Sequence, residues 1–423
     1  MTKGTRQSQL FTKTRKDAPA DEVSKNAELL TRGGFIHKEM AGVYTYLPLG
    51  LRVLKKIENI IRDEVNSVGA QEVSMTALQN PELWKKTDRW NDEVVDNWFK
   101  TKLKNDTELG LAFSHEEPLV NMLTNFISSY KDLPLSVYQF QTKFRNELRA
   151  KSGILRGREF LMKDMYSFNT TQEDFDSFYE KMKIVYKNIF QKVGIGHITY
   201  LTFASGGIFS KYSHEFQTLT SAGEDTIYVD EATSIAVNQE VFNDEVLANL
   251  NLEKEKLVEH KAIEVGNIFE LKTKFSKPFD LSYVDEKGEK HEVLMGCYGI
   301  GVGRLMGTVV EALADDKGII WPESIAPFKV HLLMLGDDEE VKKRADEVFE
   351  TLQKNNIEVL FDDRVGLSAG EKFADADLLG MPYRAVISAR SIKEDGVEIK
   401  KRNEEKGKVI NMEELLKLLA PNH

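Results

Sequence analysis

Cysteine is almost absent from this chain: among 423 residues there is one, Cys297. A single thiol cannot form an intrachain disulfide or a cysteine-rich zinc site, so we expect no metal bound by protein cysteines. No apolar run approaches the roughly 20 residues that span a bilayer, and the polar, basic first 16 residues lack the apolar stretch of a secretory signal. We therefore expect a cytoplasmic protein without membrane contact, whose basic head is a disordered or RNA-contacting tail.

An excess of positive charge is also missing. The formal net charge is −11, so a nucleic acid would have to bind local basic patches against a repulsive background. Hydrophobic residues make up 41% and charged residues 30%, which is typical of a soluble globular protein. The length exceeds what one ordinary core needs and favours two domains. By composition alone, the chain is typical of an acidic metabolic enzyme.

Apolar periodicity predicts the main elements. An apolar stripe that starts at Leu51 predicts a helix over 51–68, and a second helix is expected over 173–193, with Thr170 and Glu173 at the spacing of a capping box. Towards the C-terminus, strands and helices alternate as they do in a small, separate α/β domain. The strands are expected at 330–335, 357–361 and 384–388, and the helices at 339–354, 371–379 and the chain end.

Two neighbouring segments, 137–147 and 157–168, predict an antiparallel hairpin with one polar face. Arg145 and Glu147 share that face, and Arg158 or Phe160 can approach them across the hairpin. These residue types suit a nucleotide, because arginine binds phosphate with two hydrogen bonds and an aromatic ring stacks on a base. A salt-bridged surface hairpin is the alternative that these residues alone leave open.

A glycine-rich block, 296–304, leads into an apolar helix. Its glycines lack the spacing of a dinucleotide-binding fingerprint, and it contains no Gly-Lys-Ser/Thr of a phosphate-binding loop. The glycines instead allow a strand and a helix to pack closely and leave Arg304 at the start of the helix.

The hairpin resembles motif 2, and the glycine-rich block motif 3, of the class II aminoacyl-tRNA synthetases. Segments that are similar to prolyl-tRNA synthetases in particular span nearly the whole chain: 44–57, 139–168, 213–216 and 295–304. The resemblance implies an α+β catalytic domain, with an antiparallel sheet of six or seven strands and flanking helices, a C-terminal α/β anticodon-binding domain, and a homodimer.

The resemblance also implies domain limits of 1–325 and 326–423. Within the catalytic domain it indicates motif 1 at about 50–78, motif 2 at about 137–168, a short connector at about 225–262, and motif 3 at about 294–313. Motif 1 usually ends in proline, and this chain has Thr76 there. Bacterial members usually carry a large editing insertion between motifs 2 and 3, whereas only about 48 residues separate Phe216 from Val265 here. We therefore expect no editing in cis and a separate deacylase in trans.

The resemblance further implies roles for single residues, with Arg145 and Arg304 as the catalytic ones. The residues expected to bind ATP, with Mg²⁺, are Arg145, Glu147, Arg156, Phe160, Glu270, Thr273 and Arg304. Those expected to bind L-proline are Ser114, Glu116, Arg145, Met162, Asp164 and His214. Ser114 replaces the family's usual threonine, and Glu270 its usual glutamine. Those expected to contact the anticodon are Asp362, Arg364, Lys372 and Arg402.

Three alternatives concern residues near these positions. Ser114, His115 and Glu116 contain the letters of a hydrolase triad, but adjacent residues on an extended chain point to opposite sides. His214 is equally well explained as a hydrogen-bonded structural histidine. Cys297 is interpreted as a packing residue rather than as a border of the active site.

The implied function is a proline–tRNA ligase, which forms prolyl-adenylate and transfers proline to the 3′ end of tRNA(Pro). One rival is another class II synthetase, for threonine, glycine, histidine or serine, and the run Arg158 to Asp164 disfavours it. The other rival is a non-catalytic paralogue that binds tRNA or a protein. The presence of Arg145, Arg156 and Arg304 disfavours this second rival.

Overall fold

The computed structural model describes residues 4–17, 24–148, 150, 152–207 and 212–420. They form two compact units. The central unit contains 40–43 and 58–308, and the terminal unit contains the described residues of 1–39, 44–57 and 309–423. The division passes through two helices, α2 (Pro48–Asn66) and α7 (Val302–Leu313). No helix in these ranges is both long enough and apolar enough to cross a membrane.

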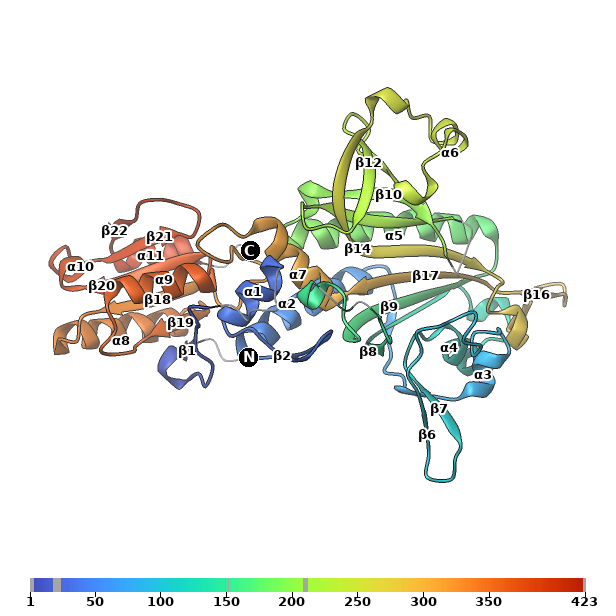
Figure 1. Cartoon of the computed structure of the whole chain (residues 1–423), viewed down its shortest axis with the longest axis horizontal. Coiled ribbons are helices and arrows are strands. Elements are labelled where there is room, and N and C mark those ends of the chain that lie inside the picture. Colours follow the sequence, from blue (N-terminus) through green and yellow to red (C-terminus); the bar gives the residue numbers. More distant parts are fainter. Residues whose placement is uncertain (1–3, 18–23, 149, 151, 208–211, 421–423) are drawn as a thin grey trace. The chain divides into compact units, whose positions relative to one another are not determined.

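Nine strands form one sheet in the central unit (Figure 1). In sheet order they are β11 (Tyr212–Leu219), β10 (Thr199–Ser205), β13 (Ile235–Asn238), β12 (Asp225–Asp230), β14 (Val258–Lys272), β17 (Leu294–Gly301), β9 (Glu159–Asn169), β8 (Leu135–Phe144) and β4 (Gln71–Glu72). Two neighbouring pairs, β10–β13 and β4–β8, are parallel, and the others are antiparallel. The predicted antiparallel sheet is confirmed, but it has nine strands and not six or seven.

Helix α5 (Gln172–Val193) lies along this sheet and confirms the helix expected over 173–193 (Figure 1). Its first turn is capped by Thr171, whose hydroxyl accepts a hydrogen bond from the backbone of Asp174 at 3.1 Å. The predicted capping box of Thr170 and Glu173 is therefore wrong by one position. The helix ends at Gly194, which has a φ of 98° that favours glycine.

Helix α2 confirms the helix expected over 51–68, although its apolar stripe differs. Leu54, Ile57 and Ile61 are buried as expected, whereas Leu51 is 44% exposed.

The other short elements of the chain are α1 (Lys25–Arg32), α3 (Pro81–Lys85), α4 (Glu116–Leu123), α6 (Asp244–Asn249), β2 (Ile36–Met40), β3 (Val43–Tyr46), β5 (Leu78–Gln79), β6 (Lys100–Lys102), β7 (Glu108–Leu111), β15 (Ser282–Val284) and β16 (Lys290–Glu292).

The terminal unit contains a six-stranded sheet that confirms the expected α/β domain. Its order is β1 (Gly4–Arg6), β19 (Val359–Asp362), β18 (Val330–Leu335), β20 (Tyr383–Ser388), β21 (Val397–Lys401) and β22 (Lys408–Ile410). Its C-terminal helices are α8 (Glu339–Lys354), α9 (Ala369–Leu379), α10 (Ala389–Lys393) and α11 (Met412–Leu419). The alternation of strands and helices did not predict β21, β22 or α10.

The basic head of the chain is part of this sheet. Strand β1 pairs in parallel with β19, with Gly4 opposite Val359. The Arg6 guanidinium pairs with Asp346 at 2.7 Å and lies 5.1 Å and 5.0 Å from two aromatic ring centres, those of Phe349 and Phe361. The expectation of a disordered head is therefore wrong for residues 4–16, and residues 1–3 lie outside the described ranges.

We predict that Arg6→Ala lowers the free energy of unfolding of the terminal unit by about 1 kcal/mol, because a half-exposed ion pair and two ring contacts are lost. Urea unfolding measures the effect. Arg390→Ala is a matched control, since Arg390 forms an exposed ion pair with Glu394 within one helix region and that pair does not involve a strand. Equal losses in the two variants would contradict the role of Arg6 in attaching β1 to the sheet.

Candidate active site

Strands β8 and β9 form the predicted hairpin, with Gln139 opposite Asp164 and Phe144 opposite Glu159. Its polar face is buried rather than solvated. Gln139 and Lys143 are each 1% exposed, and Asp164 is 3% exposed. A surface hairpin held by salt bridges is therefore excluded.

A pocket lies at this polar face, within the central unit. Among its lining residues are nine that the sequence predicted for ATP or proline: Ser114, Glu116, Arg145, Glu147, Arg156, Phe160, Met162, Asp164 and Arg304. They come from α4, the hairpin and its loop, and the start of α7. Strand β14 adds Glu264 and Asn267, and β17 adds Cys297 and Gly299.

The glycines of β17 allow neighbouring side chains to pack closely on both faces of the strand. A Cβ atom on Gly296 would lie 3.0 Å from the ring of Phe175 on α5. On the pocket side, a Cβ atom on Gly299 would lie 2.7 Å from both Met162 and Asn267. Close packing at these glycines agrees with the expectation from the sequence.

Arg145 occupies the middle of the pocket without an ionic partner in the described part of the chain. Its guanidinium carbon lies 5.0 Å from the ring centre of Phe113 and 5.3 Å from that of Phe160. Its buried Nε has no hydrogen-bond partner in the same described ranges. Burial, together with the charge of Arg304, lowers the pKa of this guanidinium. Such an arginine is an open site for an anion that accepts two hydrogen bonds.

Two further arginines line one end of the pocket. Arg304 donates from Nε to the carbonyl of Leu155 at 2.9 Å and from Nη1 to a carboxylate oxygen of Glu264 at 3.0 Å. Arg156 donates from Nη2 to Oε2 of Glu147 at 3.0 Å and remains 47% exposed at its side chain. This end of the pocket is therefore basic, with its guanidinium groups oriented by neighbouring acids and carbonyls.

Carboxylates line the other end. The hydroxyl of Tyr166 lies 3.2 Å from Oε1 of Glu116 and 3.1 Å from Oδ2 of Asp164. Gln139 donates to the same Asp164 oxygen at 3.0 Å. Glu116 is 1% exposed, and although burial alone would raise its pKa, the guanidinium of Arg89 holds the pKa below its usual value. This end of the pocket is suited to a cation.

A chain of polar contacts supports Asp164 from below. Lys143 forms an ion pair with Oδ1 of Asp164 at 2.9 Å and also contacts Nδ1 of His115. Nε2 of His115 lies 3.0 Å from the carbonyl of Thr76 and therefore carries the proton. Burial and the charge of Lys143 lower the pKa of His115 to about 4, so the ring is neutral at pH 7. Both ring nitrogens of His115 are therefore engaged, by Thr76 and Lys143, and neither is bonded to Ser114. This geometry disfavours the hydrolase triad.

Three predicted residues lie away from the pocket lining. On β14, Asn267 and Phe269 face the pocket, whereas alternation turns Ile268 and Glu270 to the face covered by α5. His214, opposite Ile268, contacts the hydroxyl of Tyr179 on α5 at 3.0 Å.

Burial lowers the pKa of His214 to about 3, so the ring is neutral at pH 7. Thr273 follows the end of β14 and also lies outside the lining. The structure thus does not bring Glu270, Thr273 or His214 together with the rest of the site.

Some residues of the site were missed or misinterpreted. Cys297 lines the pocket, with its thiol 3.8 Å from Glu116, so its interpretation as a packing residue alone is wrong. Tyr166 was not among the residues that the sequence predicted for the site. Arg89 gave no pattern at all, because the acids that it pairs with, Glu116 and Glu117, lie 27 and 28 residues away.

The four residues predicted to read the anticodon are engaged within the terminal unit. Asp362 is fully buried and pairs with Arg364 at 2.6 Å, and Lys372 donates to the carbonyl of Met334 at 2.8 Å. Arg402 is 7% exposed and pairs with Asp315. Three of the four, Asp362, Lys372 and Arg402, therefore offer little surface to an RNA base.

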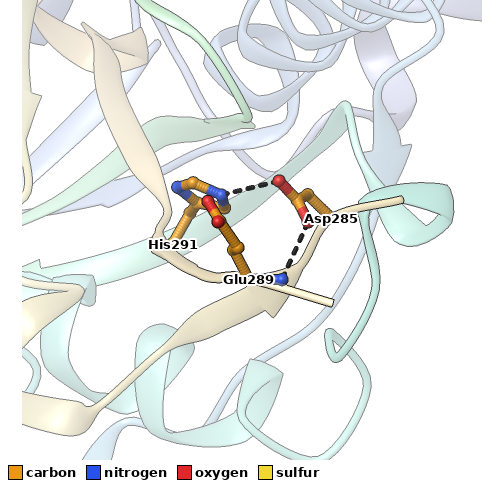
Figure 2. A group of neighbouring side chains, drawn as sticks. All are labelled: Asp285, Glu289 and His291. Atoms are coloured by element: carbon orange, nitrogen blue, oxygen red, sulfur yellow. Dashed lines mark hydrogen bonds and ion pairs between the residues drawn. The ribbon is translucent and has the colours of Figure 1, made fainter. Parts of the chain in front are cut away.

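One group of metal-ligand type lies outside the pocket, on the hairpin of β15 and β16 (Figure 2). Asp285 accepts a hydrogen bond from the backbone of Glu289 at 2.9 Å and contacts Nε2 of His291 at 2.9 Å. Glu289 and His291 reach solvent, and both carboxylate oxygens of Asp285 are already engaged, by the backbone of Glu289 and by His291. We assign no metal to this group.

The sequence of this chain matches known families. Residues 99–313 match the family of the class II tRNA synthetase core domain (G, H, P, S and T), and 326–422 match that of an anticodon binding domain. A proline–tRNA ligase of Wolbachia sp. subsp. Drosophila simulans is 38% identical, and one of Hyphomonas neptunium is 36% identical. Each alignment covers 97% of this chain and 98% of the relative.

Two solved structures have the same fold. A prolyl-tRNA synthetase of Giardia lamblia, in complex with prolyl-adenylate, has a TM-score of 0.76 and 19% identity, over 93% of this chain and 75% of that one. A prolyl-tRNA synthetase of Cryptosporidium parvum, with L-proline and AMP, has a TM-score of 0.74 and 18% identity, over 93% of this chain and 74% of that one. From the sequence relatives and the matched core domain, we conclude that this chain belongs to the family of proline–tRNA ligases.

Proposed function

We propose that the protein activates L-proline with ATP and transfers it to tRNA(Pro). The observation that carries the proposal is the position of Arg145, an unpaired guanidinium between an acidic end at Glu116 and a basic end at Arg156 and Arg304. Proline offers an ammonium followed by a carboxylate, and ATP offers phosphates. The charges along the pocket follow that order.

In this proposal the secondary ammonium of proline binds Glu116 and Ser114, and Arg145 holds the carboxylate beside the α-phosphate. A carboxylate oxygen attacks the α-phosphorus, and the bond to pyrophosphate breaks. Arg156 and Arg304 neutralise the phosphate charge, so the step needs alignment and no protein nucleophile. The 3′ hydroxyl of the tRNA then attacks the prolyl carbonyl, and AMP leaves.

The nucleotide and its ion fit residues that the pocket presents. Phe160 has Arg145 at 5.3 Å from its ring centre, and we propose that its ring also stacks on adenine. Glu147 uses only Oε2 for Arg156, which leaves Oε1 without a hydrogen bond in the described ranges. We propose that Glu147 and Glu264 would hold Mg²⁺ together with the phosphates. When bound, the ion would neutralise charge on the leaving pyrophosphate.

The first test is ATP–pyrophosphate exchange with a panel of amino acids. We expect exchange with proline and background rates with threonine, glycine, histidine and serine, because the sequence relatives that cover nearly the whole chain are proline–tRNA ligases. Exchange with another amino acid would favour a different class II synthetase. Absence of exchange with every amino acid would favour the non-catalytic paralogue.

A second test addresses Arg145 itself. We predict that Arg145→Lys lowers kcat/KM for proline in exchange about 100-fold, because an ammonium cannot donate two parallel hydrogen bonds to two oxygens. Arg62→Lys is the control, since Arg62 pairs with Glu72 outside the pocket and should stay within about twofold. Near-normal exchange by Arg145→Lys would refute the role.

We also propose that the enzyme does not edit in cis. Between β11 and β14 the chain contains only β12, β13 and α6 with their connections, packed on a small apolar cluster that includes Val237 and Leu247. A relative from Geobacillus sp., named proline–tRNA ligase, aligns over 561 residues, whereas the Wolbachia alignment spans 425. The two alignments differ by 136 residues (561 minus 425), a length that suits an additional domain in the Geobacillus relative.

Discrimination against alanine by binding alone is modest, because the two side chains differ by few methylene groups. We therefore predict that the purified enzyme leaves alanyl-tRNA(Pro) intact at the rate of spontaneous hydrolysis, as measured by release of labelled alanine. A known trans-acting deacylase added to the same tube is the positive control. Clearance by the enzyme alone would contradict this proposal and would imply a hydrolytic site in the short connector.

We further propose that the enzyme acts as a cytoplasmic homodimer and that the terminal unit contacts tRNA. Its family match as an anticodon binding domain supports the tRNA contact. Because Asp362 and Lys372 are buried, we propose that they shape the recognition surface and leave the contact itself to more exposed residues, among them Arg364.

A further inference from the structure

Arg89 is a buried arginine that no step of the proposed reaction uses. It follows α3, is 2% exposed, and does not line the pocket. Its guanidinium carbon lies 4.8 Å from the ring centre of Trp84 and 5.2 Å from that of Phe275. A charge in such surroundings has lost its water, so its carboxylate partners determine whether it is tolerated.

Those partners are two consecutive glutamates. Nη1 of Arg89 lies 3.1 Å from Oε2 of Glu116 and 3.0 Å from each carboxylate oxygen of Glu117. Glu116 lines the pocket, and its other oxygen, Oε1, contacts Tyr166 and the thiol of Cys297. Because Arg89 fixes Oε2 from behind, Oε1 is the oxygen left beside the pocket-lining groups.

Acids are close together at this end of the pocket. Glu116, Glu117 and Asp164 are buried carboxylates, and Arg89 and Lys143 are the buried cations that form ion pairs with them. Burial raises the pKa of Glu117 to about 7. A bound ammonium beside Oε1 of Glu116 would add a positive charge on the side of this carboxylate away from Arg89.

We infer that Arg89 is a positioning residue for the amino acid: it holds Glu116 ionised and turned towards the ammonium of proline. The inference rests on the proposed function. It assigns to Arg89 a role in the affinity for the amino acid and none in the binding of ATP, because the carboxylates that it pairs with, Glu116 and Glu117, belong to the acidic end. Without Arg89, two adjacent buried carboxylates would share a proton near neutral pH, and Glu116 would lose its charge.

Every charged or titratable group that faces Glu116 enters this balance. Those packed against it are Arg89, Glu117, His115, Asp164, Tyr166 and Cys297, with Lys143 and Lys163 beside Asp164 and Arg145 across the pocket. Lys274 lies within range of Arg89 and Glu117. His115 stays neutral at pH 7, so none of the other groups can replace the guanidinium at Oε2 of Glu116.

The test is ATP–pyrophosphate exchange by Arg89→Met and Arg89→Lys, from pH 6 to pH 9. For Arg89→Met we expect KM for proline to rise about 100-fold at pH 7 and KM for ATP to stay within about twofold, since the loss is confined to one buried ion pair. Its kcat/KM for proline, relative to the natural protein, should rise with pH. A carboxylate whose pKa is raised is protonated at low pH and regains its charge as pH increases.

Arg89→Lys keeps a charge at the site and should lose about tenfold, which makes the test informative if the methionine variant does not fold. Thr87→Val is the matched control: Thr87 donates to Glu117 at 2.7 Å and has no bond to Glu116, so KM for proline should stay within about twofold. Equal rises of KM for proline and for ATP in Arg89→Met would overturn the inference. So would a kcat/KM for proline that, relative to the natural protein, does not change with pH. If the natural protein itself showed no proline-dependent exchange, the proposed function would fail instead.

Discussion

Compensation of buried charge is the constraint on which this site depends. An ionised carboxylate inside a sheet costs several kcal/mol unless cations and hydrogen bonds replace its water. Asp164 meets that requirement through Lys143, Gln139 and Tyr166, which come from both strands of one hairpin. Because each partner is itself buried and engaged, the acidic end of the pocket has one arrangement of its side chains, set before any ligand arrives.

The basic end is organised differently. Arg156 and Arg304 are oriented by the carboxylates of Glu147 and Glu264, whereas the guanidinium of Arg145 lies beside the rings of Phe113 and Phe160. Rings fix the plane of a guanidinium and leave its donors available, which an ion pair would not do. The pocket thus combines an acidic end whose carboxylates are held by hydrogen bonds with an arginine whose Nε has no hydrogen-bond partner in the described ranges.

The sequence predicted the parts of this arrangement that are local. Alternation identified the hairpin, the resemblance located Arg145 and Arg304, and periodicity located the long helices. The sequence did not predict to which face of the sheet Glu270 points. Which residues of β14 face the pocket depends on its register with β11 and β17, strands that are distant in the sequence. Arg89 has no signature either, since its function comes from two glutamates that the fold brings to it.

The pairing of β1 with β19 has a consequence for the order in which the protein matures. Ser8 and Asp363, joined by hydrogen bonds at 3.0 Å and 2.7 Å, are 355 positions apart, so β1 cannot pair until β19 has been synthesised. Until then β1 is a strand without its neighbour, and such unpaired strands favour misassembly. The addition of β1 to the sheet is therefore a late, long-range step of folding.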